Sequence, residues 1–190
     1  MGSEMKAVSS ESAKVEMLRR IRAAVGGVSN GEVARAGWSR LERGYRRAGT
    51  LEHEALLELL EDRLRDYDAH VVRVGRADVA RAVAVRLGER GIKRMVVPVG
   101  LAAEWLPVGF EFVVDEGISA AELDGVDGVM TGSAVAIAET GTVVLQNVPG
   151  QGRRAATLVP DYHLCVVRVE DVVETVPEAI DRLAGTSGLA

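Results

Sequence analysis

The strongest constraint on the fold is the alternation of short aliphatic runs with longer amphipathic segments in the middle of the chain. Residues 78–90 place Val79, Val83 and Leu87 at helical spacing and are followed by Gly91, a typical helix stop. Strands that alternate with helices of about 10 to 15 residues favour a parallel sheet with right-handed crossovers. The expected strands on either side of this helix and beyond it are 70–74, 94–99 and 111–114.

The second half of the chain predicts a hairpin within this architecture. Thr140–Gly141 separates two apolar runs, 135–139 and 142–146, and suits a tight turn in which the glycine takes a positive φ. With 4% aromatic residues, the core must be mainly aliphatic. We therefore expect an α/β fold with a mixed, mainly parallel sheet. The remaining expected elements are strands at 127–130 and 163–169 and helical segments at 153–159 and 170–183, with Pro177 opening the last helix.

An N-terminal helical arm is predicted at 1–49, ahead of a domain at 50–190. Its first helix, 12–25, should stop at Gly26–Gly27. Farther along, three apolar residues at positions i, i+3 and i+7 form a stripe that we expect to pack against an interior. These residues are Trp38, Leu41 and Tyr45.

The domain is expected to begin with a helix at 51–67, the strongest helical pattern in the chain. Thr50 is a suitable N-cap residue, because its hydroxyl can accept a hydrogen bond from a free backbone N–H of the first turn. One face of this helix should be buried, formed by Leu56, Leu60, Leu64 and Tyr67.

Charge and cysteine content exclude several classes of protein. The net charge of −5 and the absence of a basic stripe argue against nucleic-acid binding. The chain contains no run of about 20 apolar residues, so we do not expect it to insert into a membrane. Residues 1–6 lack the apolar stretch of a secretory signal, so we expect a cytoplasmic protein. Cys165 is the single cysteine, in an aliphatic run that predicts a buried, inert thiol.

Candidate binding residues gather in loops at the ends of expected strands. In open α/β sheets, ligands bind outside the carboxyl ends of strands. Backbone N–H groups of glycine-rich loops and an arginine suit a small anionic ligand such as a carboxylate. The residues are Thr131, Gly132, Ser133, Thr140, Gly141, Gly150, Gln151, Gly152, Arg153, Arg154 and Asp161.

The turn 150–155 also matches the glycine pattern of a dinucleotide-binding loop, but its spacing excludes that function. The dinucleotide-binding fold needs a full-length crossover helix after this turn. Pro160 leaves fewer than about ten residues for that helix. A tight turn that presents Arg153 or Arg154 to an anion, or to a carboxylate of the protein itself, is the better interpretation.

Glu139 and His163 are the candidate catalytic residues. Glu139 ends an apolar run beside small residues, where a carboxylate could act as base, nucleophile or ligand anchor. A salt bridge or a clamp on backbone N–H groups that fixes the hairpin is the other interpretation. Asp161 and His163 are two apart, so on a strand they would share a side and could form a carboxylate–imidazole pair or a structural hydrogen bond. No spacing predicts a metal site.

Four spaced elements resemble the signature of a known family. The chain resembles the LutC/YkgG-like branch of the LUD-domain (lactate utilisation) family, over about Leu51 to Leu183 and in the arm as well. The elements occur in order as Thr131–Ser133, Ala136–Thr142, Pro149–Arg154 and Leu158–His163.

The resemblance implies a fold and a function. The implied fold is a three-layer α/β/α sandwich similar to the NagB/RpiA/CoA-transferase-like group. The implied role is in a three-protein system that oxidises L-lactate to pyruvate and carries iron–sulfur clusters. An all-cysteine cluster needs about four thiolates, so this chain would be the cluster-free, accessory or substrate-handling subunit, with no cofactor of its own and iron–sulfur proteins as partners.

Two alternatives remain at this stage. A stand-alone acyl or CoA-type transferase would use Glu139 as nucleophile, an analogy at the level of the fold. A non-catalytic module would bind a small anion. The sequence also leaves self-association into a homo-oligomer open.

Overall fold

The structure is a computed structural model that describes residues 10–26 and 31–187. Gly27, part of the expected helix stop, and residues 1–6, in which no secretory signal was expected, lie outside these ranges. The chain divides into two compact units, Met1–Tyr45 and Arg46–Ala190. Within the described residues, no helix has the length and apolar character needed to cross a membrane.

The described part of the first unit contains the helices α1 (Ser10–Ala24) and α2 (Gly31–Ser39). The helix expected at 12–25 is therefore confirmed, and Gly26 follows it with a φ of +76°. The helical spacing expected for the stripe is wrong, because α2 ends at Ser39; its three side chains are 55–68% exposed. Arg43, beyond the helix, lies over the ring of Trp38, with its Cζ 4.8 Å from the ring centroid.

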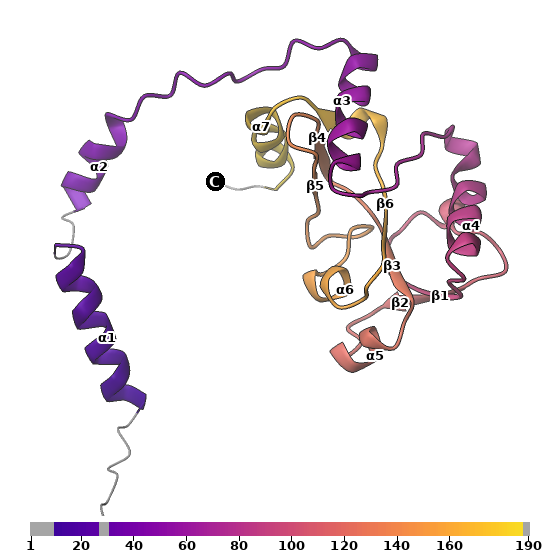
Figure 1. The fold of residues 1–190 in the computed structure, drawn as a ribbon, viewed down its shortest axis with the longest axis horizontal. Helices are drawn as coiled ribbons and strands as arrows, with labels where there is room; N and C mark the ends of the chain where they lie inside the picture. Colours follow the sequence, from indigo (N-terminus) through magenta and orange to yellow (C-terminus); the bar gives the residue numbers. More distant parts are fainter. Residues whose placement is uncertain (1–9, 27–30, 188–190) are drawn as a thin grey trace, which may run out of the picture. The chain divides into compact units, whose positions relative to one another are not determined.

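The second unit is an α/β domain (Figure 1). The helices expected at 51–67, 78–90 and 153–159 and the strands expected at 94–99, 111–114 and 127–130 are confirmed within a few residues at their ends. The helices are α3 (His53–Arg65), α4 (Val79–Glu89), α5 (Ala120–Asp124), α6 (Arg154–Leu158) and α7 (Val176–Ser187), with short 3-10 turns at Arg76–Asp78, Ala103–Trp105 and Val169–Asp171. The strands are β1 (Arg94–Pro98), β2 (Glu111–Asp115), β3 (Gly128–Gly132), β4 (Val135–Ile137), β5 (Thr142–Val144), β6 (His163–Val166) and β7 (Val172–Val173).

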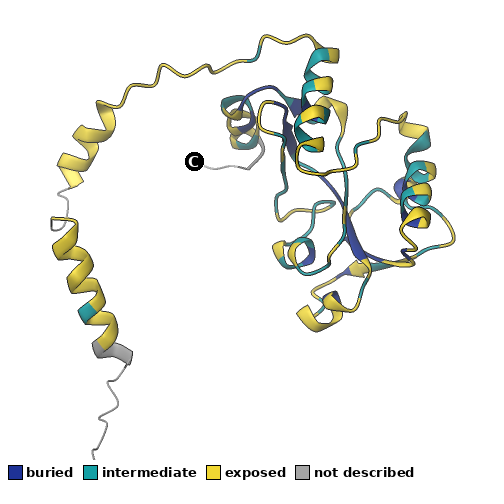
Figure 2. Ribbon diagram, viewed as in Figure 1, coloured by how far each residue is buried: buried dark blue, intermediate teal, exposed yellow. Residues whose placement is uncertain are grey.

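Four strands form a parallel sheet in the order β2-β1-β3-β6. Successive residues of a strand point to opposite faces, and both faces are covered. Met95 and Met130 pack with α4 on one face, whereas Val96 and Val129 pack with α5 and α6 on the other. The two central strands, β1 and β3, are accordingly almost entirely buried and dark blue in Figure 2, whereas most of β2 and β6 is not. This arrangement confirms a mainly parallel α/β fold.

The hairpin belongs to a second sheet rather than to the first. β4 pairs antiparallel with β5 and parallel with β7, in the order β5-β4-β7. The expected hairpin is confirmed, and Gly141 in its turn has a φ of +62°. A Cβ at Gly141 would also lie 2.9 Å from Cβ of Arg63 in α3, so only glycine fits there. The β7 strand was not expected, because two residues leave no periodic pattern.

Three local expectations are wrong. Thr50 does not cap α3, because the N-cap position is Glu52, two residues farther along; Thr50 donates its backbone N–H to Glu174. Tyr67 lies beyond the end of α3 and is 75% exposed. The segment 70–74 is extended but has no ladder of backbone hydrogen bonds, so it is not a strand. The last difference opens a space beside β6, described below.

Candidate functional site

Two of the predicted loops, 131–133 and 150–154, meet at the carboxyl ends of β1 and β3. The N–H of Gly132 donates to the carbonyl of Gly150 at 2.8 Å, and the N–H of Gly150 donates to the carbonyl of Val99 at 2.8 Å. A Cβ at Gly132 would lie 3.4 Å from that same Gly150 carbonyl oxygen. The strand ends and the turn thus bond to one another, and these backbone groups are occupied within the protein.

The turn at 150–154 is held by its own side chains. Gly150 and Gly152 both have positive φ, +83° and +78°. The side-chain oxygen of Gln151 accepts from the N–H of Gln146 at 2.7 Å. Arg153 binds Asp115 of β2, the protein carboxylate that the sequence left open as a partner, while Arg154 is exposed at the start of α6.

The Asp115–Arg153 pair is the best-defined ion pair at these strand ends. The carboxylate of Asp115 is only 2% exposed. Burial by itself would raise its pKa, but the hydrogen bonds from Arg153 and from the N–H groups of Gly117 and Ile118 outweigh burial and lower the pKa. Asp115 is therefore ionised at neutral pH, and Arg153 is committed to it.

Ser133 follows β3 and its hydroxyl is buried. Among the described residues it is the one buried side-chain polar atom without a hydrogen-bond partner. Its neighbour Thr131, in contrast, is fully buried and bonded to two side chains of β6.

The third loop makes contacts with other elements. Glu139 forms an ion pair with Arg46, and its N–H donates to the carbonyl of Glu174. Thr140 donates to the hydroxyl of Thr142 at 2.8 Å. The structure therefore supports the clamping interpretation of Glu139, because its carboxylate binds a cation of the protein. The Glu139 side chain is 48% exposed.

Glu174 anchors the entry into the domain, and no sequence pattern pointed to this residue. Its buried carboxylate, 6% exposed, accepts from the N–H groups of Thr50 and Leu51 at 2.6 and 2.7 Å and pairs with Arg46. The bond from the Leu51 N–H is the main cause that lowers the pKa of Glu174. Because Arg46 bridges Glu174 and Glu139, the hairpin and the entry segment 46–51 are fastened together.

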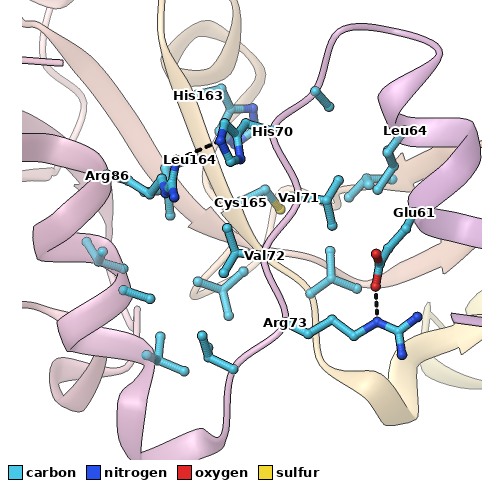
Figure 3. Close-up of a pocket in the computed structure, with 18 of the residues that line it drawn as sticks. Glu61, Leu64, His70, Val71, Val72, Arg73, Arg86, His163, Leu164 and Cys165 are labelled. Atoms are coloured by element: carbon cyan, nitrogen blue, oxygen red, sulfur yellow. Dashed lines mark hydrogen bonds and ion pairs between the residues drawn. The ribbon is translucent and has the colours of Figure 1, made fainter. Parts of the chain in front are cut away.

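A pocket of about 800 Å³ lies beside the free edge of β6 (Figure 3). It is bounded by α3, α4, the extended segment 69–74 and β6, and His163 is the only one of the sequence-predicted site residues that lines it. Its walls are mostly aliphatic, formed by Leu57, Leu60, Leu64, Val71, Val72, Val74, Val79, Ala82, Val83, Val143, Leu145, Leu164, Val166, Val167, Val169 and Val172.

Cationic and imidazole side chains also line this pocket. The guanidinium Nη1 of Arg86 lies 2.8 Å from Nε2 of His70 and 2.9 Å from the carboxylate of Glu89. Arg90 stacks over the ring of Tyr162 at 4.6 Å. Figure 3 shows the Arg86–His70 contact, and a separate pair between Arg73 and Glu61 near α3.

Of the two interpretations of His163, the carboxylate–imidazole pair with Asp161 does not form, and the imidazole makes a hydrogen bond to Thr131 instead. Asp161 precedes β6, whereas Nε2 of His163 lies 2.8 Å from Oγ1 of Thr131. The register explains this, because His163 pairs with Val129, and Thr131 is two residues farther along the same face of β3. Burial lowers the pKa of His163, so its imidazole is neutral at pH 7.

A chain of hydrogen bonds links His163 to the end of β3. The Cys165 thiol donates to the carbonyl of Gly132 at 3.6 Å, and the Thr131 hydroxyl lies 3.7 Å from Cys165 Sγ and 2.8 Å from Nε2 of His163. In a neutral imidazole one ring nitrogen donates and the other accepts, so Nδ1 takes the role opposite to that of Nε2. Burial raises the pKa of Cys165 to about 11, in agreement with an inert thiol.

His70 and Arg86 are the residues that sequence reasoning missed. They are 16 positions apart, on an irregular segment and on a helix, so no periodicity connects them. No group of three or more His, Cys, Asp or Glu side chains in the described part of the chain is arranged to hold a metal ion.

Comparisons with known proteins agree with the pattern of these loops. The LUD domain model matches residues 56–189. The chain is 41% identical over 181 residues to "Lactate utilization protein C" of Deinococcus radiodurans, which covers 94% of this chain and 79% of that protein. It is also similar to the crystal structure of a DUF162 family protein from Deinococcus radiodurans, with 44% identity and a TM-score of 0.69, over 72% of this chain and 83% of that one.

Proposed function

Because the chain belongs to the LUD domain family, we propose that it is a component of a lactate-utilization system. The observation that carries this proposal is the 41% identity, over 94% of the chain, to a protein named Lactate utilization protein C. Identity at that level extends over both the arm and the domain, so the proposal concerns the whole chain.

Within that system, we assign the chain the role of the cluster-free subunit. Oxidation of L-lactate to pyruvate releases two electrons and two protons, and the electrons need an acceptor. Cys165 is the single thiol, its pKa is raised to about 11, and an all-cysteine cluster takes about four thiolates. Iron–sulfur proteins would therefore be the partners that accept electrons, and this chain would handle substrate or support assembly in the cytoplasm.

The contacts of Glu139 favour this role over a stand-alone transferase. Glu139 binds Arg46 through Oε1, and Arg46 also binds Glu174, so the ion pair ties the hairpin to the entry of the domain. We therefore assign Glu139 a structural role, and no observed contact favours an acyl or CoA-type transferase.

Reconstitution of the lactate-oxidising system tests the proposal. The three proteins are purified together with and without this chain, and lactate-dependent reduction of an artificial electron acceptor is measured. Oxidation should fall when the chain is left out and return when it is added back. Unchanged oxidation in its absence would overturn the proposal.

A further inference from the structure

The pocket beside β6 exists because two backbone edges are not paired with each other. β6 is the last strand of its sheet, so one edge is free. The segment 70–74 has a strand-like sequence and lines the same space, yet none of its backbone groups bonds to β6. A fifth strand paired there would close the gap. In its place lies a space of about 800 Å³, within the range of pockets that hold drug-sized ligands.

Arg86 presents one unused edge of its guanidinium. Both of its protein contacts, His70 and Glu89, are made by Nη1. Within the described residues, Nε and Nη2 have no partner, and these two atoms form the fork that binds a carboxylate through two parallel hydrogen bonds. The side chain is 29% exposed, so the fork is partly shielded from water, which strengthens a charge-assisted bond.

His163 adds a hydrogen-bonding group to the lining. Its Nδ1 has no hydrogen-bond partner in the part of the chain that the structure describes, and the residue is exposed, so this nitrogen is open to a ligand or to solvent. A neutral imidazole nitrogen forms a hydrogen bond with a hydroxyl group in either tautomer, because a hydroxyl both donates and accepts.

The acidic residues of the lining are mostly paired with arginines. Glu61 is held by Arg65 and Arg73, and Glu89 is held by Nη1 of Arg86. Asp68, three residues beyond the end of α3, is balanced in charge by Arg90, which stacks on Tyr162. The preference for an anion therefore rests on the open Nε–Nη2 edge of Arg86 and not on an excess of positive charge.

We propose that this pocket binds an organic carboxylate whose aliphatic body is longer than that of lactate. The Nε–Nη2 edge of Arg86 holds the carboxylate, with His70 fixing the guanidinium from the other side, and the valine and leucine walls cover the chain. Lactate has three carbons and leaves most of this space and most of the apolar wall without contact. The inference does not depend on the proposed role in lactate utilization.

Calorimetric titration of the purified full-length chain tests the proposal. The probes are octanoate, 2-hydroxyoctanoate, L-lactate and octylamine, which vary the chain length, the hydroxyl group and the charge. Octanoate should bind at one saturable site, with L-lactate and octylamine weaker by about tenfold or more, as expected when apolar contact or the charge pair is lost. The 2-hydroxy acid should bind at least as tightly as octanoate, because Nδ1 of His163 can form a hydrogen bond with its hydroxyl group.

Two pairs of variants locate the site. Arg86→Gln should weaken octanoate binding about tenfold or more, whereas Arg81→Gln should not, because Arg81 on the same helix also pairs with a carboxylate three residues away but does not line the pocket. Val72→Glu should weaken binding, whereas Val85→Glu should not. These two valines are 46% and 47% exposed, so neither change disturbs the core, and only Val72 lines the pocket.

Three results would overturn the proposal. They are no saturable binding of octanoate, equal affinity for L-lactate, or equal effects of the Arg86 and Arg81 variants. Hydrogen exchange gives an independent measurement: slow exchange at the amides of 71–74 would mean that this segment pairs with β6 and closes the pocket. Fast exchange that slows on addition of octanoate would support the proposal. Loss of lactate oxidation without this chain is a separate result, so the two proposals can fail separately.

Discussion

Arg153 donates two hydrogen bonds to the buried carboxylate of Asp115, from Nε at 2.8 Å and from Nη2 at 3.0 Å. The same guanidinium also donates to the carbonyl of Ile118. The turn at 150–154 is thereby tied to the end of β2. Of the two adjacent arginines, Arg153 stabilises the fold and Arg154 is exposed to solvent. The sequence could not tell which of the two binds a protein carboxylate.

Loss of this pair should destabilise the domain. Arg153→Gln leaves the Asp115 carboxylate buried without its cation, and we expect a loss of about 2–3 kcal/mol, at the low end for buried pairs because a third of the Arg153 side chain reaches solvent. Arg154→Gln is the matched control and should change stability by less than about 0.5 kcal/mol. Urea denaturation measures both, and equal effects would contradict the assignment.

Glu139→Gln should leave lactate oxidation largely intact in the reconstituted system. The amide keeps the shape of the side chain and one acceptor for Arg46, so the hairpin keeps its place. A nucleophilic glutamate would instead lose nearly all activity on this change. Incubation of the wild-type chain with acyl-CoA, followed by mass spectrometry, gives the complementary result: a covalent adduct on Glu139 would restore the transferase alternative.

Glu174→Gln should lower the melting temperature more than Glu139→Gln. Glu174 is 6% exposed and its ionised carboxylate accepts from two backbone N–H groups and from Arg46, whereas Glu139 is 48% exposed and binds Arg46 alone through its side chain. Because the folded-state pKa of Glu174 is lowered, its contribution should be present near neutral pH and lost as pH falls through that pKa. Equal melting temperatures at pH 7 would contradict the anchoring role.

His163 should also make the stability of the domain depend on pH. Burial lowers its pKa below 6.5, so the unfolded chain binds a proton that the folded chain does not. Stability should therefore fall as pH falls below about 6.5, and His163→Gln should reduce that dependence. His53→Gln, on the exposed surface of α3, is the control for loss of a histidine. The measurement is the free energy of unfolding at several pH values between 7 and 5.

Cys165 should react slowly with alkylating reagents. With a pKa of about 11, its thiolate fraction at pH 8 is roughly a hundredfold or more below that of a free cysteine, whose pKa is about 8.5. Iodoacetamide labelling followed by mass spectrometry gives the rate, and the same reaction in urea gives the rate for the unfolded chain. Similar rates in the two conditions would contradict a buried thiol bonded to Thr131 and Gly132.

The sequence by itself determined the fold class and most of the elements. The period of Val79, Val83 and Leu87 predicted a helix with one buried face, and the aliphatic run that follows it, 94–99, predicted a strand that is covered on both faces. The hairpin followed from Gly141, because a positive φ is a local property of one residue. The spaced loop motifs were sufficient to recognise the family.

Tertiary structure alone decided the partners of the polar residues. Arg153 could have faced a ligand or Asp115, and His163 could have bonded Asp161 or Thr131. The cation that binds Glu139 was equally open. Each outcome depends on segments that the fold brings together across 32 to 93 positions of sequence. The segment 70–74 shows the same limit for the backbone. Its residues favour a strand, but a strand exists only where a second edge lies within hydrogen-bonding distance, and that edge is supplied by the rest of the fold.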